Sequence, residues 1–224
     1  MLLHLREVLK NDELMLARDW LSKASFTAGR FSAGSAAMRV KNNEEIDQRS
    51  VDIGRLNALV MGGLLRHPVY RGGALALHVA APFYVRYRPG MAYGDHLDDP
   101  VMGADGVMYR SDIAITVFLN PAQDYAGGEL VVQTSHGEQV VKLPAGDAVL
   151  YPAGSVHHIN PVTHGERLVA ITWVQSMVRD PAQRELLYGL NAAREKLLQD
   201  APDASETQQV NAAYLNLIRM WSDI

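Results

Sequence analysis

A series of short runs rich in β-branched, aliphatic and aromatic residues occupies the middle of the chain, from Leu75 to Val174. The runs are LALHVA, FYVRYR, IAITVFL, ELVVQT, EQVVKL, DAVLY and RLVAITWV. They recur at intervals of about 8–14 residues and are separated by turn-forming segments such as RPG, SHG, PAG and PVTHG. Short strands at this spacing are typical of a sandwich or barrel, so the sequence predicts a mainly β core.

Helical periodicity precedes this β region. Apolar residues recur every three or four positions from Asn11 to Ala24, and again from about Glu44 to Arg66, where the pattern stops before Pro68. Each stretch has one apolar side, which must be buried against another element. We expect both N-terminal helices to pack on the sheet.

A second helical region follows Asp180-Pro181, breaks at Ala201-Pro202-Asp203 and continues from Val210 to Trp221. We interpret residues 179–224 as a C-terminal helical appendage. A helix pair this short buries little apolar surface alone, so it must pack on the β core or on a second copy of the chain. Its apolar content makes homodimerisation through these helices a working hypothesis.

Charge and composition exclude several classes of protein. A net charge of -4 and a pI near 6.0 give no basic field for nucleic acid. No apolar stretch is long enough to cross a membrane, and the N-terminal residues lack a cleavage-site pattern, so we expect a cytoplasmic protein that keeps them. The chain has no cysteine, which leaves histidines and carboxylates as its strong metal ligands.

The segment Tyr93-Gly94-Asp95-His96-Leu97-Asp98 contains a candidate metal site. In an extended strand, residues i and i+2 face the same side, so His96 and Asp98 can reach one ion. A third ligand from the distant pair His157-His158 would complete two histidines and one carboxylate. That set leaves coordination positions open and is expected of a non-haem iron(II) oxygenase.

Arg167 follows the histidine pair on the next predicted strand, across a turn. A guanidinium matches a carboxylate in a bidentate, charge-assisted pair, and a desolvated keto diacid needs such a partner. The alternative is an ordinary surface salt bridge from Arg167 to Glu166 or Asp147.

A family resemblance extends over nearly the whole chain. Its motifs are Tyr87-Arg88-Pro89-Gly90, Tyr93, His96, Asp98, Leu119-Asn120, Gly127-Gly128-Glu129-Leu130, Gly146-Asp147, Tyr151-Pro152, His157, Pro161-Val162, Gly165, Arg167 and Trp173. Together they resemble the prolyl-4-hydroxylase-like iron and 2-oxoglutarate dioxygenases. Val40-Lys41-Asn42-Asn43 and the stretch Trp173 to Asp180 resemble in particular the bacterial PKHD-type hydroxylases, a group associated with iron uptake.

The resemblance implies a double-stranded β-helix, or jelly-roll, domain over residues 1–178. It implies that His96, Asp98 and His157 bind Fe(II). Of the two adjacent histidines, His157 is the expected ligand because the family's distal histidine lies ten residues before its arginine. Arg167 would then pair with the distal carboxylate of 2-oxoglutarate, and Tyr87 would donate a hydrogen bond to it, unless Tyr87 is simply a packed core tyrosine. Dioxygen is the second co-substrate, ascorbate the expected reductant, and succinate, CO2 and a hydroxylated product are released.

Other polar residues near these motifs have open roles. Asp95 and Asp99 could orient His96, or could simply be exposed. Arg39, Lys41, Asn42 and Asn43 could contact substrate at the mouth of the site, although solvated polar residues would form the same pattern. His136 and His164 fall in predicted turns, where we expect them to be solvated.

Two rival functions remain at this stage. A cupin-type metal-dependent hydrolase or isomerase could use the same histidines and aspartate, often with a fourth protein ligand and without need of Arg167. A non-catalytic module sensing iron or 2-oxoglutarate could keep the fold without turnover. The sequence leaves the substrate unidentified, either a peptide side chain or a small molecule, since function depends on the site rather than the fold.

Overall fold

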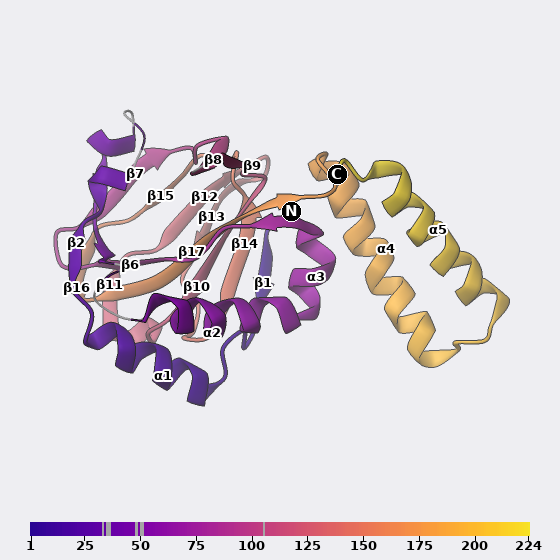
Figure 1. Ribbon diagram of the computed structural model, residues 1–224, viewed down its shortest axis with the longest axis horizontal. Coiled ribbons are helices and arrows are strands. Elements are labelled where there is room, and N and C mark those ends of the chain that lie inside the picture. The colour runs from indigo at the N-terminus through magenta and orange to yellow at the C-terminus, as the bar shows by residue number, and fades with distance from the viewer. Residues whose placement is uncertain (33, 35–36, 48, 50–51, 105) are drawn as a thin grey trace.

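The computed structural model describes residues 1–32, 34, 37–47, 49, 52–104 and 106–224. Two antiparallel β-sheets face each other in the body of the molecule, and helices flank them (Figure 1). The larger sheet has the order β1-β14-β10-β17-β6-β4-β2, with β5 paired to β17. Its strands are β1 (Leu3–Leu5), β14 (Ala148–Pro152), β10 (Ile113–Phe118), β17 (Arg167–Ser176), β6 (Phe83–Tyr87), β4 (Glu44–Ile46), β2 (Phe26–Ala28) and β5 (Ala76–Val79).

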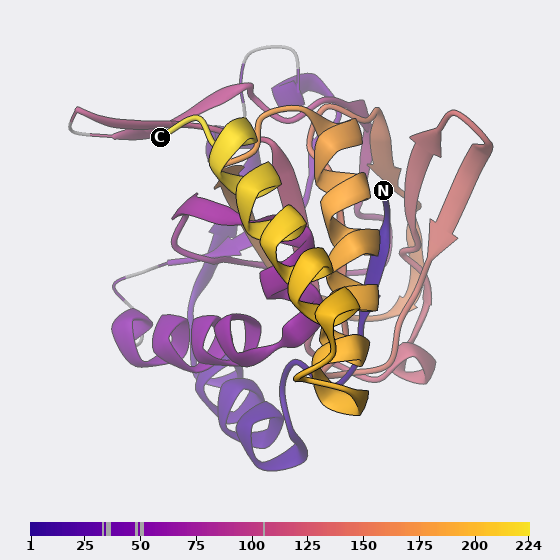
Figure 2. The ribbon, with the colours of Figure 1, turned by 90° about the vertical axis from the view of Figure 1, so that its right-hand side faces the viewer.

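The smaller sheet has the order β13-β12-β15-β7-β3. Its strands are β13 (Gly137–Val141), β12 (Leu130–Thr134), β15 (His157–Ile159), β7 (Ala92–His96) and β3 (Lys41–Asn42). Two further pairs are β11 (Tyr125–Gly127) with β16 (Val162–Gly165), and β8 (Val101–Ala104) with β9 (Val107–Arg110). The β8–β9 hairpin projects from the body (Figure 2). Short 3-10 turns occur at Gly29–Ser32, Ala37–Arg39 and Ala122–Asp124.

The larger sheet is buried on both faces, and alternation along its strands divides the core in two. In β17, Leu168 and Ala170 belong to the apolar cluster under the helices, whereas Val169 belongs to the cluster between the two sheets. This is the period of two expected for a strand. All six residues of β10 are buried, as expected for a central strand covered on both sides.

Helices α1 (Asn11–Ser22), α2 (Ile53–Arg66) and α3 (Pro68–Ala74) cover the outer face of the larger sheet (Figure 1). The prediction of N-terminal helices on the sheet is confirmed. The predicted helix from Glu44 was wrong at its start, because Glu44–Ile46 forms the strand β4, paired with β2 and β6. The helix begins at Ile53, where the Asp52 carboxylate accepts a hydrogen bond from the Arg55 backbone at 3.2 Å.

The C-terminal appendage is a hairpin of two long helices, α4 (Pro181–Asp200) and α5 (Ser205–Trp221), side by side in Figures 1 and 2. Asp180 caps α4 by accepting from the Ala182 backbone at 2.7 Å, with Pro181 at the first turn. A small apolar cluster of Leu75, Val178, Leu187 and Tyr214 joins the hairpin to the body. Within the described part of the chain, no helix has the length and apolarity that a bilayer-spanning segment requires.

Candidate metal centre and co-substrate pocket

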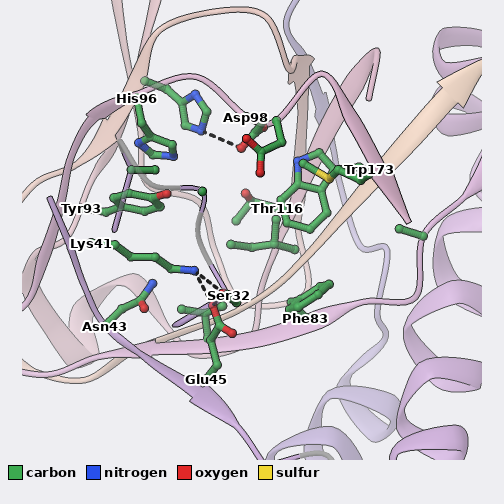
Figure 3. A pocket seen from close by; sticks show the side chains of 18 of the residues that line it. Ser32, Lys41, Asn43, Glu45, Phe83, Tyr93, His96, Asp98, Thr116 and Trp173 are labelled. Atoms are coloured by element: carbon green, nitrogen blue, oxygen red, sulfur yellow. Dashed lines mark hydrogen bonds and ion pairs between the residues drawn. The ribbon is translucent and has the colours of Figure 1, made fainter. Parts of the chain in front are cut away.

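The structure brings His96, Asp98 and His157 together in the cavity between the two sheets (Figure 3). One potential ligand atom from each side chain lies within 4.8 Å of the others. His96 on β7 faces His157 on β15 as its paired residue, and Asp98 Oδ1 lies 3.8 Å from His157 Nε2. The expectation that His96 and Asp98 share a strand was wrong in detail, since β7 ends at His96. The three side chains converge all the same.

Backbone carbonyls fix the tautomer of both histidines. The Nδ1 atom of His96 lies 2.8 Å from the carbonyl oxygen of Gly94, and Nδ1 of His157 lies 2.9 Å from that of Ser155. A carbonyl oxygen only accepts, so each Nδ1 must carry the proton. In the neutral form of each ring the lone pair is therefore on Nε2, which is the state required of a metal ligand.

Burial disfavours charge on these groups. The pKa of His96 is lowered to about 4, first by burial and then by the neighbouring His157. Burial raises the pKa of Asp98, although His157 opposes that effect. Asp98 Oδ2 is buried and has no hydrogen-bond partner among the described residues. Two imidazoles and one unsatisfied buried carboxylate form a site that a divalent cation would stabilise.

A β-bulge packs an aromatic ring against His96. His157 pairs with His96 and Ile159 with Tyr93, so β7 contains one residue more than β15 over this stretch. The extra residue lets Tyr93 and His96 stack, with ring centroids 3.5 Å apart and planes inclined by 11°. This contact was not predictable from the sequence, because simple alternation places residues three apart on opposite faces of a strand.

Arg167, at the start of β17, is fully buried in the same cavity. Its Nε, Nη1 and Nη2 atoms make no hydrogen bond of acceptable geometry among the described residues, and the nearby hydroxyl of Tyr125 is likewise buried without a partner. The guanidinium carbon lies 5.2 Å from the centroid of the Tyr87 ring and 5.6 Å from that of Phe118. A buried, unpaired cation costs several kcal/mol, so this site calls for an anionic ligand.

The surface salt bridge considered for Arg167 is wrong. Asp147 instead contacts His4, with 2.6 Å between the carboxylate and Nε2. Glu166 is partly exposed and lies 3.6 Å from the guanidinium of Arg88. Both carboxylates are therefore engaged elsewhere, Asp147 with His4 and Glu166 with Arg88.

Tyr87 is paired with Arg167 across β6 and β17 and is also buried. Its hydroxyl accepts a hydrogen bond from the side-chain amide of Asn43 at 3.0 Å. Burial raises the pKa of Tyr87, whereas the charge of Arg167 acts in the opposite direction. Tyr87 is thus both a packed core tyrosine and a residue of the cavity wall, with its hydroxyl proton available to a ligand.

The other polar residues singled out in the sequence differ in whether they line the cavity. His158 points away from His157 and its Nδ1 lies 2.7 Å from the Asp95 carboxylate, so Asp95 contacts His158 rather than His96. Asp99 lines the cavity. Lys41 also lines it, and its ammonium lies 2.5 Å from the Glu45 carboxylate.

The other turn and mouth residues are more exposed. His136 and His164 are exposed, as expected, but only His136 lies in a turn. The turn predicted for His164 was wrong, because this residue lies on β16, which pairs with β11. Arg39 and Asn42 are exposed and are not among the residues that line the cavity, whereas Asn43 is buried within the wall.

The cavity has a volume of about 610 Å³, and its two sides differ in character (Figure 3). The polar side carries Lys41, Asn43 and Glu45 from the N-terminal segment. The other side is mostly apolar and is formed by Ala80, Ala81, Phe83, Val101, Met102, Tyr109, Ile171 and Trp173. The space is ample for a C5 diacid beside the histidines, with room left for part of a second molecule.

The arrangement provides three potential ligand side chains and a buried cation in the walls of one cavity. Two histidines and one carboxylate with open positions are the donor set of a non-haem iron(II) oxygenase. No fourth histidine, aspartate or glutamate joins the group in the part of the chain that the structure describes. The donor set and the unpaired Arg167 therefore fit an iron ion and an anionic co-substrate.

Comparisons with known proteins agree with this chemistry. The model of the 2OG-Fe(II) oxygenase superfamily matches residues 82–175, and that of the PKHD-type hydroxylase C-terminal domain matches residues 181–223. A PKHD-type hydroxylase of Thioalkalivibrio sulfidiphilus is 50% identical over 224 residues, which is 100% of both chains.

Solved structures share the fold at lower identity. A prolyl hydroxylase of Trichoplax adhaerens, solved with a peptide of hypoxia inducible factor, has a TM-score of 0.55 at 18% identity, covering 83% of this chain and 86% of that one. A prolyl-4-hydroxylase of Pseudomonas putida has a TM-score of 0.50 at 20% identity, covering 78% and 92%. The expected double-stranded β-helix with flanking helices is confirmed. The chain belongs to the PKHD-type hydroxylases and is an iron(II)- and 2-oxoglutarate-dependent dioxygenase.

Proposed function

We propose that His96, Asp98 and His157 bind the Fe(II) ion, and that Arg167 and Tyr87 bind the distal carboxylate of 2-oxoglutarate. The observation that carries this proposal is the buried guanidinium of Arg167, whose nitrogens have no partner among the described residues. A fold does not leave a cation desolvated and unpaired without a compensating ligand. A dicarboxylic keto acid supplies one carboxylate for Arg167 and a second end for the metal.

Each side chain has a defined task in this scheme. The Nε2 atoms of His96 and His157 and the carboxylate of Asp98 hold the ion on one side, which keeps the other side open to ligands. The carbonyls of Gly94 and Ser155 keep both rings oriented. Iron with 2-oxoglutarate supplies the oxygen chemistry that hydroxylates a C–H bond and releases succinate and CO2.

Arg167 gives the co-substrate its orientation. Its guanidinium offers two parallel N–H donors to a carboxylate, and the Tyr87 hydroxyl opposite it on β6 offers a third. Holding the far end of the diacid in this way directs the keto acid end toward the histidines. The apolar side of the cavity limits the access of water. On that side the rings of Phe83 and Trp173 meet edge to face, with their centroids 5.6 Å apart.

The substrate belongs to the proposal only as a class, an unidentified peptide side chain or small molecule. Room for a second molecule beside the diacid supports either. Ascorbate is the proposed reductant, the cytoplasm the proposed compartment, and a role in iron uptake the proposed context. Metabolites and peptides of a deletion strain and its parent, compared for a mass difference of one oxygen atom, would identify the product.

Turnover separates this proposal from its rivals. Purified protein with Fe(II), ascorbate and 2-oxoglutarate should form succinate, and cell extract containing the substrate should increase the rate. An enzyme that releases no succinate in either condition would favour the sensing module. Activity that requires zinc or manganese and no keto acid would favour the cupin-type hydrolase or isomerase, which has no need of the buried, unpartnered guanidinium of Arg167.

We also propose that residues 1–178 form the jelly-roll domain and residues 179–224 an appendage that mediates homodimerisation. Support comes from exposed apolar side chains on the two helices, including Leu186 and Leu215 at 65% and 47% exposure. Light scattering at micromolar concentration should give twice the monomer mass. A monomeric mass under those conditions would reject the dimer while leaving the assignment of the site intact.

A further inference from the structure

The hydroxyl of Tyr87 has one proton, and the structure indicates where that proton points. The side-chain nitrogen Nδ2 of Asn43 donates to the Tyr87 oxygen at 3.0 Å, in a buried contact. Because the hydroxyl accepts from Asn43, its own proton remains free for a different acceptor. Arg167 lies opposite Tyr87 in the strand pairing and lines the same cavity. An anion bound to Arg167 would therefore lie close enough to accept a hydrogen bond from the Tyr87 hydroxyl.

The amide of Asn43 is held in place by its surroundings. Asn43 is 4% exposed, and its backbone carbonyl oxygen accepts a hydrogen bond from the Gly29 backbone N–H at 2.9 Å. Its Oδ1 atom packs so closely on Gly29 that a Cβ atom there would lie only 2.1 Å away. Oδ1 has no hydrogen-bond partner in the described part of the chain. The bond to Tyr87 and the contact with Gly29 thus fix the orientation of the amide.

The carboxylate of Glu45, in the same cavity, is paired with a cation. Glu45 lines the same cavity, but its Oε1 atom lies 2.5 Å from the Lys41 ammonium and 2.7 Å from the Ser32 hydroxyl (Figure 3). The Glu45 carboxylate is therefore engaged and repels a bound anion less than a free carboxylate would. Among the described residues, this end of the cavity presents the unpaired cation Arg167 with the neutral hydroxyl of Tyr87 beside it.

We propose that Asn43 is a positioning residue for the co-substrate. It fixes the direction of the Tyr87 proton, so that Tyr87 and Arg167 together select a 2-oxo acid that carries a distal carboxylate. The inference rests on the proposed roles of Arg167 and Tyr87 and adds the reason why the hydroxyl acts as a donor.

Two substitutions at the same position should have different effects. In Asn43→Ala the proton of Tyr87 stays free, and the affinity for 2-oxoglutarate should fall by about threefold to tenfold. In Asn43→Asp the new carboxylate can only accept, so the hydroxyl turns its proton toward Asp and its lone pairs toward the ligand. That reversal, with the added negative charge, should weaken binding by about 100-fold or more.

The test is anaerobic titration of the Fe(II)-loaded protein, followed by its visible metal-to-ligand band, with 2-oxoglutarate and with 2-oxobutyrate. The second acid has the same keto acid end but no distal carboxylate. Asn43→Asp should lower the affinity for 2-oxoglutarate far more than Asn43→Ala does. The affinity for 2-oxobutyrate should be the same in all variants. In a Tyr87→Phe background there is no hydroxyl to turn. The difference in 2-oxoglutarate affinity between Asn43→Asp and Asn43→Ala should then shrink to the effect of the added negative charge alone.

Equal 2-oxoglutarate affinities for Asn43→Asp and Asn43→Ala would overturn the proposal, as would equal weakening of both acids. Gly29→Ala is a second variant, in which the new methyl group displaces the amide without adding charge; it should weaken 2-oxoglutarate and spare 2-oxobutyrate. Arg167→Met identifies which proposal fails. If it leaves 2-oxoglutarate affinity unchanged, the assignment of Arg167 is wrong and the role of Asn43 falls with it. If it weakens binding and the Asn43 variants do not, only the role of Asn43 is wrong.

Discussion

His96 and His157 face each other as paired residues of the antiparallel strands β7 and β15, with ring centroids 4.2 Å apart and planes inclined by 50°. The hydrogen-bonded ladder of the smaller sheet thus sets the spacing of two proposed metal ligands from remote parts of the sequence. A site built on paired strands is more rigid than one built on loops, which suits an ion that must keep open positions.

The adjacent histidines give a direct test of this register. His157→Ala should reduce Fe(II) affinity by more than about 100-fold, because it removes a proposed ligand whose Nε2 faces the site. His158→Ala should leave Fe(II) affinity nearly unchanged, because His158 points to the opposite side and contacts Asp95. Equilibrium dialysis with both variants measures the difference. Loss of iron in the His158 variant alone would reverse the assignment.

Arg167→Met should have opposite effects on binding and stability. Loss of a buried bidentate pair of about 3–5 kcal/mol should raise the dissociation constant of 2-oxoglutarate by about two to three orders of magnitude. The ligand-free protein should gain stability, since a buried unpaired charge is removed. Urea denaturation without ligands measures the gain. Arg88→Met, at a partly exposed residue, is the control for losing a guanidinium, and an unstable Arg167→Met protein would contradict the account.

The stability of the metal-free protein should depend on pH through His96. Its pKa falls from the ordinary 6.5 to about 4 in the folded state, through burial and then through His157. Between these values the unfolded chain binds the proton and the folded chain does not, so stability decreases as pH falls from about 6.5 to 4. The slope should reach about 1.4 kcal/mol per pH unit. Denaturation measured across this pH range should show that stability depends less steeply on pH in His96→Gln than in the unsubstituted protein. Equal slopes would refute the assignment of this pH dependence to His96.

Gly128 should be intolerant of a side chain. Its φ of +69° is unfavourable for other residues, and a Cβ atom there would lie 2.9 Å from Val162 and 3.1 Å from Cδ of Arg167. Gly128→Ala should lower the free energy of unfolding by about 1–3 kcal/mol. It should also weaken the binding of 2-oxoglutarate, because the new methyl group displaces Arg167. Thermal denaturation and co-substrate titration test both effects. Gly154→Ala is the matched control, because nothing lies within 4 Å of its Cβ position.

Much of the fold was predictable from local patterns. The runs of β-forming residues between turns correspond to the strands β5, β6, β10, β12, β13, β14 and β17. The N-terminal segment was harder, since Glu44–Ile46 is a strand only because β6 and β2 lie beside it. Partners far away in the sequence decide such short strands, so a helical pattern that continues through them is misleading. Val51, part of the predicted helix, lies outside the described residues.

The candidate site was predictable to a similar extent. Residue type and spacing identified His96, Asp98 and Arg167, while the choice between His157 and His158 needed the family pattern. The stacking of Tyr93 on His96 depends on a bulge that alternation does not encode. The contact between Asn43 and Tyr87 joins segments that no local signal connects. A polar residue directly before a short strand was the only hint, and it suggested a mouth residue rather than a buried one.

The account as a whole depends on one ion held by His96, Asp98 and His157 beside a diacid held by Arg167. Anaerobic titration of Fe(II) into the protein with 2-oxoglutarate, followed by the visible metal-to-ligand band, tests this most directly. We predict a band that saturates at about one iron per chain, is absent in His96→Ala and Asp98→Asn, and needs far more 2-oxoglutarate in Arg167→Met. A band of undiminished intensity in His96→Ala, formed at the same co-substrate concentration, would contradict the account.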